Sequence, residues 1–164
     1  MSQQQTLYHW CRRVSKQFCS LSKPQAWVLA AFSLAVARVR RCALPAAAEA
    51  LPSWGKPDSL ERRWQRFLSN PHVDWSGGCT ALARWVIGAL ASSHHVVLLV
   101  DETSLRQKLK VMAVSLAYRG RAIPLAWWCY PNERWPMGQV KLVCTLLGWV
   151  APAIPPLRDR GGGN

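Results

Sequence analysis

The sequence predicts an α/β protein in which a helical N-terminal region precedes a short antiparallel sheet and a last helix. Two observations lead to this prediction. Up to about residue 75, apolar residues recur at helical spacing and two segments carry helix-start signals. Beyond that point, three apolar runs follow one another closely, at 96–100, 110–118 and 121–128, as the strands of a meander do.

The first two helices are predicted from an apolar stripe and from a cap. In the first helix, basic residues lie opposite the stripe, which consists of Leu7, Trp10, Cys11, Val14 and Phe18. Ser22 then has the features of an N-cap, with a proline in the first turn and Gln25 placed to complete a capping box. The helix that follows ends in a basic stretch at 38–41, which suits the negative pole of the helix dipole.

A third helix is expected after the proline-containing linker at 52–57. Asp58 is expected to cap this helix, and a proline after Asn70 ends it. Three arginines lie on its polar surface: Arg62, Arg63 and Arg66. They are the best candidates for DNA phosphate contacts, because arginines neutralise backbone charge in a salt-dependent way. A solvated surface of a helical bundle accounts for them equally well.

The second part of the sequence begins with a helix at about 79–91, and the three strands follow it. Gly120 lies between the last two strands and can take the positive φ that a tight hairpin needs. Pro124 cannot donate a ladder hydrogen bond, so the third strand is expected at a sheet edge and the first strand further in. A final helix is expected at 140–150.

These patterns divide the sequence into three regions. A helical DNA-binding region is expected at 1–75, a sheet-containing domain at 76–151 and an irregular tail at 152–164, where prolines and glycines argue against a regular element. The 21 lysines and arginines against 8 aspartates and glutamates give a formal net charge of +13. This excess favours nucleic acid over a membrane surface as the partner, and a solvated surface without a specific partner is the alternative.

Cysteine spacing and hydropathy exclude several other classes of protein. The six cysteines form no Cys-x-x-Cys pair and no paired spacing with histidine, which argues against a zinc site and a disulfide framework. The apolar stretch at 26–37 ends at Arg38, short of the roughly 20 residues that a membrane span needs. The N-terminus also lacks a signal peptide's pattern. The expected location is therefore the cytoplasm, in association with the nucleoid.

Asp101 is the leading candidate for a catalytic or metal-binding residue. It follows the first apolar run, and α/β proteins often place their chemistry where a buried strand ends. If the strand continued, Glu102 would point to the opposite face and could not assist Asp101. Arg119 and Arg121 flank the hairpin turn and are further candidates for DNA contact, although a solvated hairpin tip is equally plausible.

Three segments together resemble bacterial insertion-sequence transposases of the DDE type. They are the run Val-Asp-Glu-Thr-Ser at 100–104, the hairpin at 110–128 and the arginine-rich helix at 61–70. The resemblance spans about residues 20–150, and the hairpin is its most specific part. It implies a helical DNA-binding region followed by the first half of a ribonuclease-H-like catalytic domain. In that family, clustered carboxylates bind two Mg²⁺ or Mn²⁺ ions that cut transposon ends and activate strand transfer.

The resemblance also assigns roles to individual residues. Asp101 would be the first of three catalytic acids and a metal ligand. Asp159 precedes Arg-Gly, as the second acid does in the family, but the segment before it is a poor strand, which favours a tail residue. The third acid, a glutamate on a later helix, has no counterpart.

The predicted function is therefore that of a truncated DDE transposase that binds DNA and is inactive alone. Its other partner would be a second copy of the chain or an intact transposase. The alternative function is a non-catalytic DNA-binding remnant that occupies transposon ends.

Overall fold

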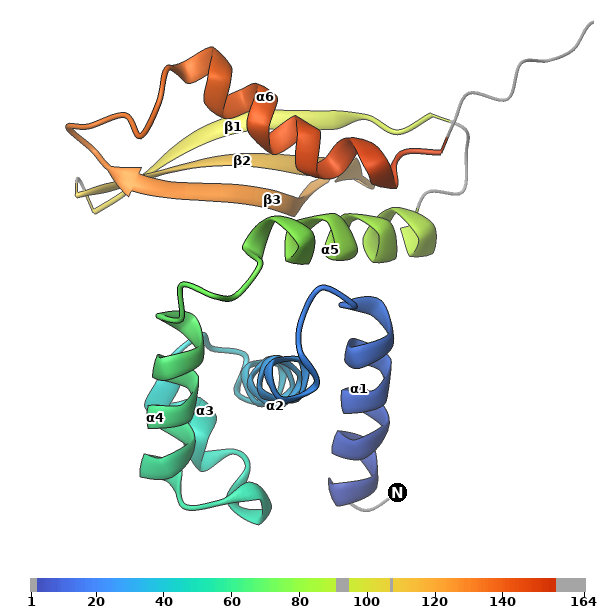
Figure 1. Cartoon of the computed structure of the whole chain (residues 1–164), viewed down its shortest axis with the longest axis vertical. Coiled ribbons are helices and arrows are strands. Elements are labelled where there is room, and N and C mark those ends of the chain that lie inside the picture. The colour runs from blue at the N-terminus through green and yellow to red at the C-terminus, as the bar shows by residue number, and fades with distance from the viewer. Residues whose placement is uncertain (1–2, 91–94, 107, 156–164) are drawn as a thin grey trace, which may run out of the picture. The chain divides into compact units, whose positions relative to one another are not determined.

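The computed structural model describes residues 3–90, 95–106 and 108–155, and the chain divides into two compact units, Met1–Trp75 and Ser76–Asn164. The described residues form six α-helices and a three-stranded antiparallel sheet (Figure 1). This finding confirms the predicted α/β class. Among the described helices, none combines the length and the apolar character that crossing a membrane requires.

The first unit is built around its second helix. Figure 1 shows α2 end-on, with α1 on one side of it and α3 and α4 on the other, and α2 contacts all three. The helices are α1 (Gln3–Gln17), α2 (Lys23–Val39), α3 (Leu44–Glu49) and α4 (Pro57–Leu68), with a 3₁₀ turn at Pro52–Trp54.

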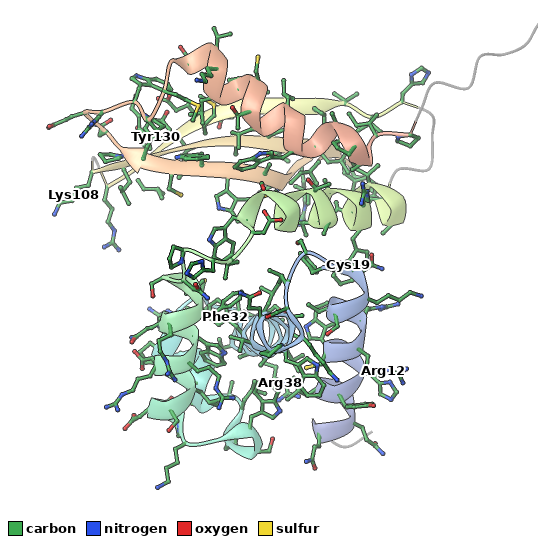
Figure 2. All side chains as sticks on the ribbon, viewed as in Figure 1. Arg12, Cys19, Phe32, Arg38, Lys108 and Tyr130 are labelled. Atoms are coloured by element: carbon green, nitrogen blue, oxygen red, sulfur yellow. The ribbon has the colours of Figure 1, made fainter. Side chains whose placement is uncertain are left out.

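Small side chains on α2 let its neighbours approach closely. Four buried alanines recur at helical spacing along α2, at positions 26, 30, 31 and 35. The helices beside α2 contribute larger buried side chains, which are Leu7, Cys11 and Val14 from α1 and Leu60, Trp64 and Phe67 from α4. Phe32, labelled in Figure 2, contacts Trp64 with ring centroids 5.2 Å apart. The predicted apolar stripe of α1 is confirmed except at Trp10, which is only half-buried.

One of the two predicted helix starts is correct and the other is wrong. Ser22 is the N-cap of α2, and its backbone N–H donates to Oε1 of Gln25 at 2.9 Å. The N-cap of α4 is Lys56 instead of Asp58, because Pro57 takes the first helical position. Proline suits that position since its fixed φ is already helical and its missing N–H would have no partner there. Asp58 lies in the first turn, where its charge favours the positive end of the helix.

The second unit combines three strands with two helices. The strands are β1 (Leu98–Leu105), β2 (Leu109–Tyr118) and β3 (Arg121–Pro131), paired antiparallel in the order β1-β2-β3. Helix α5 (Trp75–Leu90) precedes them, α6 (Gln139–Val150) follows them and contacts β2 and β3, and a 3₁₀ turn at Ala151–Ala153 comes last. The core joins α5, the sheet and α6, and its fully buried members include Ala83, Val114, Leu125, Leu142 and Leu146.

The hairpin between β2 and β3 forms as the sequence predicts. Arg119 and Gly120 have φ values of 48° and 73°, and the two residues that flank them, Tyr118 and Arg121, are paired. Positive φ at both turn residues gives the twist that joins two right-twisted strands. Pro124 lies on β3, which has no further strand beside it among the described residues, as expected. The pairing register shifts between Val114 and Ser115, next to this proline.

The first strand differs from its prediction in length and in position. It extends from Leu98 to Leu105, so Asp101 lies in the middle of the strand and not at its end. The extension is possible because β2 offers a partner for each residue as far as the Leu105–Leu109 pair. Strand β1 is also the other edge of the described sheet, whereas it was expected further in.

Candidate functional site

Asp101 lies on an open surface of the sheet. It pairs with Ala113 on β2, and its side chain is exposed. Thr103, two residues along the same strand and therefore on the same face, donates from Oγ1 to Oδ2 of Asp101 at 3.1 Å. The carboxylate is accessible to a ligand, and this hydroxyl fixes the orientation of one of its oxygens.

Glu102 lies on the opposite face and is held by two neighbours. Lys110 donates from Nζ to one carboxylate oxygen at 2.6 Å, and the Tyr130 hydroxyl donates to the other at 2.7 Å. Tyr130 is labelled in Figure 2. These hydrogen bonds, with that from Lys110 the larger influence, lower the pKa of Glu102 below its ordinary value. Burial of the phenol, followed by its contact with Glu102, raises the pKa of Tyr130 to about 12.

A tryptophan completes this polar cluster. The ring centroids of Trp135 and Tyr130 lie 5.0 Å apart, and the Lys110 ammonium lies 5.8 Å from the centroid of the Trp135 ring. We call Glu102, Lys110, Tyr130 and Trp135 the Glu102 cluster. Both oxygens of Glu102 are engaged within it, so this carboxylate is not available to act beside Asp101. The alternation of side chains along a strand also predicts that Glu102 and Asp101 lie on opposite faces.

The described residues do not fit a two-metal centre. Within 3–90, 95–106 and 108–155, no group of three or more His, Cys, Asp or Glu side chains could hold a metal ion. Asp101 has a hydroxyl as its neighbour, and Glu102 faces the other way. One carboxylate cannot supply the oxygen ligands that two Mg²⁺ ions require. Asp159, the candidate second acid, lies outside the described residues.

The arginines of α4 form an exposed basic surface. The apolar side of the helix is buried in the first unit, and Arg62, Arg63 and Arg66 are all exposed. Arg66 donates from Nε to the Arg62 carbonyl at 3.3 Å, which leaves the terminal amino groups of its guanidinium outside that bond. The salt bridge found among the described residues joins Lys110 to Glu102 and involves none of these arginines. We call Arg62, Arg63 and Arg66 the α4 arginines.

Two of the α4 arginines line a groove against α2. Its volume is about 250 Å³, and its lining combines apolar side chains with polar ones at the rim: Pro24, Gln25, Val28, Arg63, Arg66, Phe67 and Asn70. The side chains of Arg63 and Arg66 therefore border an accessible hollow whose exposed lining is mostly apolar.

Arg119 and Arg121 form a basic surface at the tip of the β2–β3 hairpin. Both are exposed, and the Arg119 guanidinium lies 5.3 Å from the centroid of the Tyr118 ring. They belong to the second unit, whereas the α4 arginines belong to the first. The predicted DNA-binding residues are thus divided between the two units.

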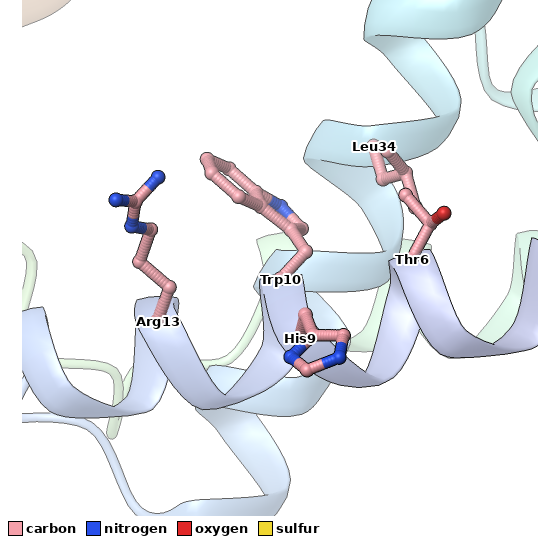
Figure 3. Close-up of a pocket in the computed structure, with 5 residues that line it drawn as sticks. All are labelled: Thr6, His9, Trp10, Arg13 and Leu34. Carbon is pink, nitrogen blue, oxygen red and sulfur yellow. The ribbon is translucent and has the colours of Figure 1, made fainter. Parts of the chain in front are cut away.

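A cavity between α1 and α2 was missed by the sequence reasoning. Its volume is about 370 Å³, and its lining residues are Thr6, His9, Trp10, Arg13 and Leu34 (Figure 3). The spacing of Trp10 matches the apolar stripe of α1 and therefore predicts a buried ring, with no sign of a cavity beside it. The signal that could have found the cavity is the spacing of His9 and Arg13, which places a cationic and an imidazole side chain one turn apart beside that tryptophan.

The comparisons with known proteins identify no relative. No family profile matches the chain, and neither a curated protein nor a solved structure matches it. The resemblance to DDE transposases therefore stays a prediction from the residues quoted for it.

Proposed function

We propose that this protein binds DNA, with the α4 arginines as its principal phosphate contacts. The observation that carries the proposal is the exposure of three arginine side chains on one helix, with no carboxylate paired to them among the described residues. Arginine forks bind phosphate oxygens in pairs, and each phosphate that is neutralised releases counterions.

Within this proposal, the chain is a DNA-binding protein of the DDE transposase type, with Asp101 as the first catalytic acid. An acid on the first strand of a three-stranded antiparallel sheet, followed by a helix, supports this assignment. The accessible position of Asp101 on the sheet also supports it, because a metal ligand must be reachable. Transposon ends would be the DNA partner, and a second copy or an intact transposase the protein partner. Association with the nucleoid follows from DNA binding.

The alternative is a protein that occupies transposon ends without cutting them. The engagement of Glu102 by Lys110 and Tyr130 favours this alternative, since the nearest second carboxylate on the strand is not free to bind a metal. On this proposal, Asp101 keeps the position of a metal ligand without its function.

The test of DNA binding is the salt dependence of affinity, measured by fluorescence anisotropy with the full chain and a labelled duplex. The triple variant Arg62→Gln, Arg63→Gln, Arg66→Gln is expected to reduce the slope of log K against log salt by about 2–3, since each phosphate contact contributes about 0.9. A matched variant removes three exposed positive charges from the second unit: Lys108→Gln, Arg134→Gln and Lys141→Gln. Equal losses in both triples would show that net charge, and not α4, drives binding.

Donor cleavage with Mg²⁺ or Mn²⁺ tests whether the chain is inactive alone. The non-catalytic alternative predicts bound but uncut DNA, and an unchanged affinity for Asp101→Ala. Robust cleavage that Asp101→Ala abolishes would overturn the expected inactivity of the chain and refute the alternative.

A further inference from the structure

The cavity between α1 and α2 presents an aromatic ring whose orientation is fixed. The indole Nε1 of Trp10 donates to Oγ of Ser33 at 2.9 Å, and that hydroxyl donates to the Ala30 carbonyl at 3.0 Å. Trp10 is nevertheless only half-buried, so part of its ring borders the cavity. A ring that is already oriented loses little conformational freedom when a ligand stacks on it.

The rim of this cavity is polar and positively charged. His9 and Arg13 are exposed and lie one helical turn apart on α1, on either side of Trp10 in the sequence. Figure 3 shows the side chains of Arg13 and Trp10 projecting from α1 in the same direction. Leu34 from α2 supplies an apolar wall. The lining therefore offers a flat apolar surface and a cation next to each other.

The charge of the two surrounding helices selects an anion. Up to residue 48 the sequence contains seven lysines and arginines and no aspartate or glutamate, and this stretch includes the whole of α1 and α2. No carboxylate from either helix can therefore neutralise Arg13 or repel an anionic ligand. A ligand that combines a planar aromatic group with a negative charge matches both halves of the lining.

We propose that this cavity takes an unstacked base of single-stranded DNA on the Trp10 ring, with an adjacent phosphate at Arg13. Its volume of about 370 Å³ lies in the range of small-molecule sites and leaves room for one nucleotide unit. Bases within a duplex are stacked on one another, so their faces cannot reach a side-chain ring without being extruded. The proposal rests on the proposed DNA binding and adds a second, single-strand site on the first unit.

The experiment compares two oligonucleotides that carry the same number of phosphates, using the full chain. One is oligo(dT), and the other is an abasic strand of equal length, which keeps the charges and lacks the bases. Wild-type protein is expected to bind oligo(dT) about tenfold more tightly than the abasic strand, from base–aromatic stacking. Trp10→Leu should abolish this preference, because leucine is apolar but offers no ring. Arg13→Gln should weaken both ligands by the same factor.

A second tryptophan provides the matched control. Trp27 is also half-buried in the first unit, where it stacks on Trp54 with ring centroids 6.3 Å apart, and it does not line the cavity. Trp27→Leu is expected to keep the preference for oligo(dT). Thermal unfolding of all variants shows whether either leucine substitution disturbs the fold.

Equal affinity of the wild-type protein for the two strands would overturn the inference, whatever the variants do. So would loss of the preference to the same extent in Trp10→Leu and Trp27→Leu. These outcomes are separate from a failure of the proposed function, which would appear as weak duplex binding that does not depend on the α4 arginines.

Discussion

Replacing Tyr130 with phenylalanine removes one hydroxyl from the Glu102 cluster. Hydrogen bonds to a charged group contribute about 1.5–3 kcal/mol to stability. The Glu102 side chain is 24% exposed, so water can partly replace the lost donor, and Lys110 stays in place at 2.6 Å. We therefore expect a loss near the lower end of that range, about 1.5 kcal/mol in the free energy of unfolding.

The assay is urea unfolding at neutral pH in a double-mutant cycle of Tyr130→Phe and Glu102→Gln. Groups in direct hydrogen-bond contact couple, so a coupling energy clearly above zero is expected here. Tyr118→Phe is the control, because Tyr118 lies on the neighbouring strand and contacts Arg119 through its ring. Tyr118→Phe should lower the free energy of unfolding by no more than about 0.5 kcal/mol, as substitutions outside buried hydrogen-bond networks usually do.

The same cluster predicts two limits on stability as pH changes. The lowered pKa of Glu102 means that its stabilisation is complete above the ordinary glutamate value of 4.5 and is lost as pH falls through the lowered value. The raised pKa of Tyr130 affects stability at alkaline pH. Between its ordinary value of 10 and about 12, the unfolded chain ionises Tyr130 and the folded chain does not, so stability decreases as pH rises.

A coupling energy of zero within error would refute this account of the cluster. An equal decrease in the free energy of unfolding for Tyr118→Phe and Tyr130→Phe would also refute it, because the effect would then be a general one of removing a tyrosine hydroxyl. In either case the hydrogen bonds to Glu102 would lose their place as support for the non-catalytic alternative, although the strand would still place Glu102 on the opposite face from Asp101.

Three other predictions concern the second unit. Leu146 is fully buried on α6, and Leu146→Ala should lower the free energy of unfolding by about 3 kcal/mol in urea titration. A decrease below about 1 kcal/mol would contradict the packing of α6 on the sheet. Gly120→Ala should destabilise the protein by about 1 kcal/mol, because φ at Gly120 is +73°. Gly148→Ala, inside α6 with open space at its Cβ, should stabilise it by about 0.5–1 kcal/mol. Thermal unfolding should show these opposite signs, which distinguish strain in the turn from a general effect of replacing glycine. Asp101→Asn should leave the midpoint of thermal unfolding almost unchanged, since its side chain is exposed and its hydroxyl neighbour also reaches water.

Local signals in the sequence are enough to predict several elements correctly. Ser22 and Gln25 fix the start of α2 because both partners of the cap lie within one turn. Gly120 fixes the hairpin because its backbone can adopt a positive φ at little steric cost. The exposure of the α4 arginines follows from the helical period, which places Arg62 and Arg66 opposite Leu60 and Trp64 and Arg63 at the border of that apolar side. Each of these features depends on residues a few positions apart.

Features that depend on distant residues could not be predicted from the sequence. The length of β1 is set by its partner strand, so no signal near Asp101 could show that the strand continues beyond it. The partners of Glu102 are 8 and 28 positions away, and they meet because three strands align in register. Trp10 fits the apolar stripe of α1 by spacing, but Ser33 on α2 holds its indole at the edge of a cavity. Helical period predicts which side of a helix is apolar, whereas the packing of its neighbours decides how much of that side they cover.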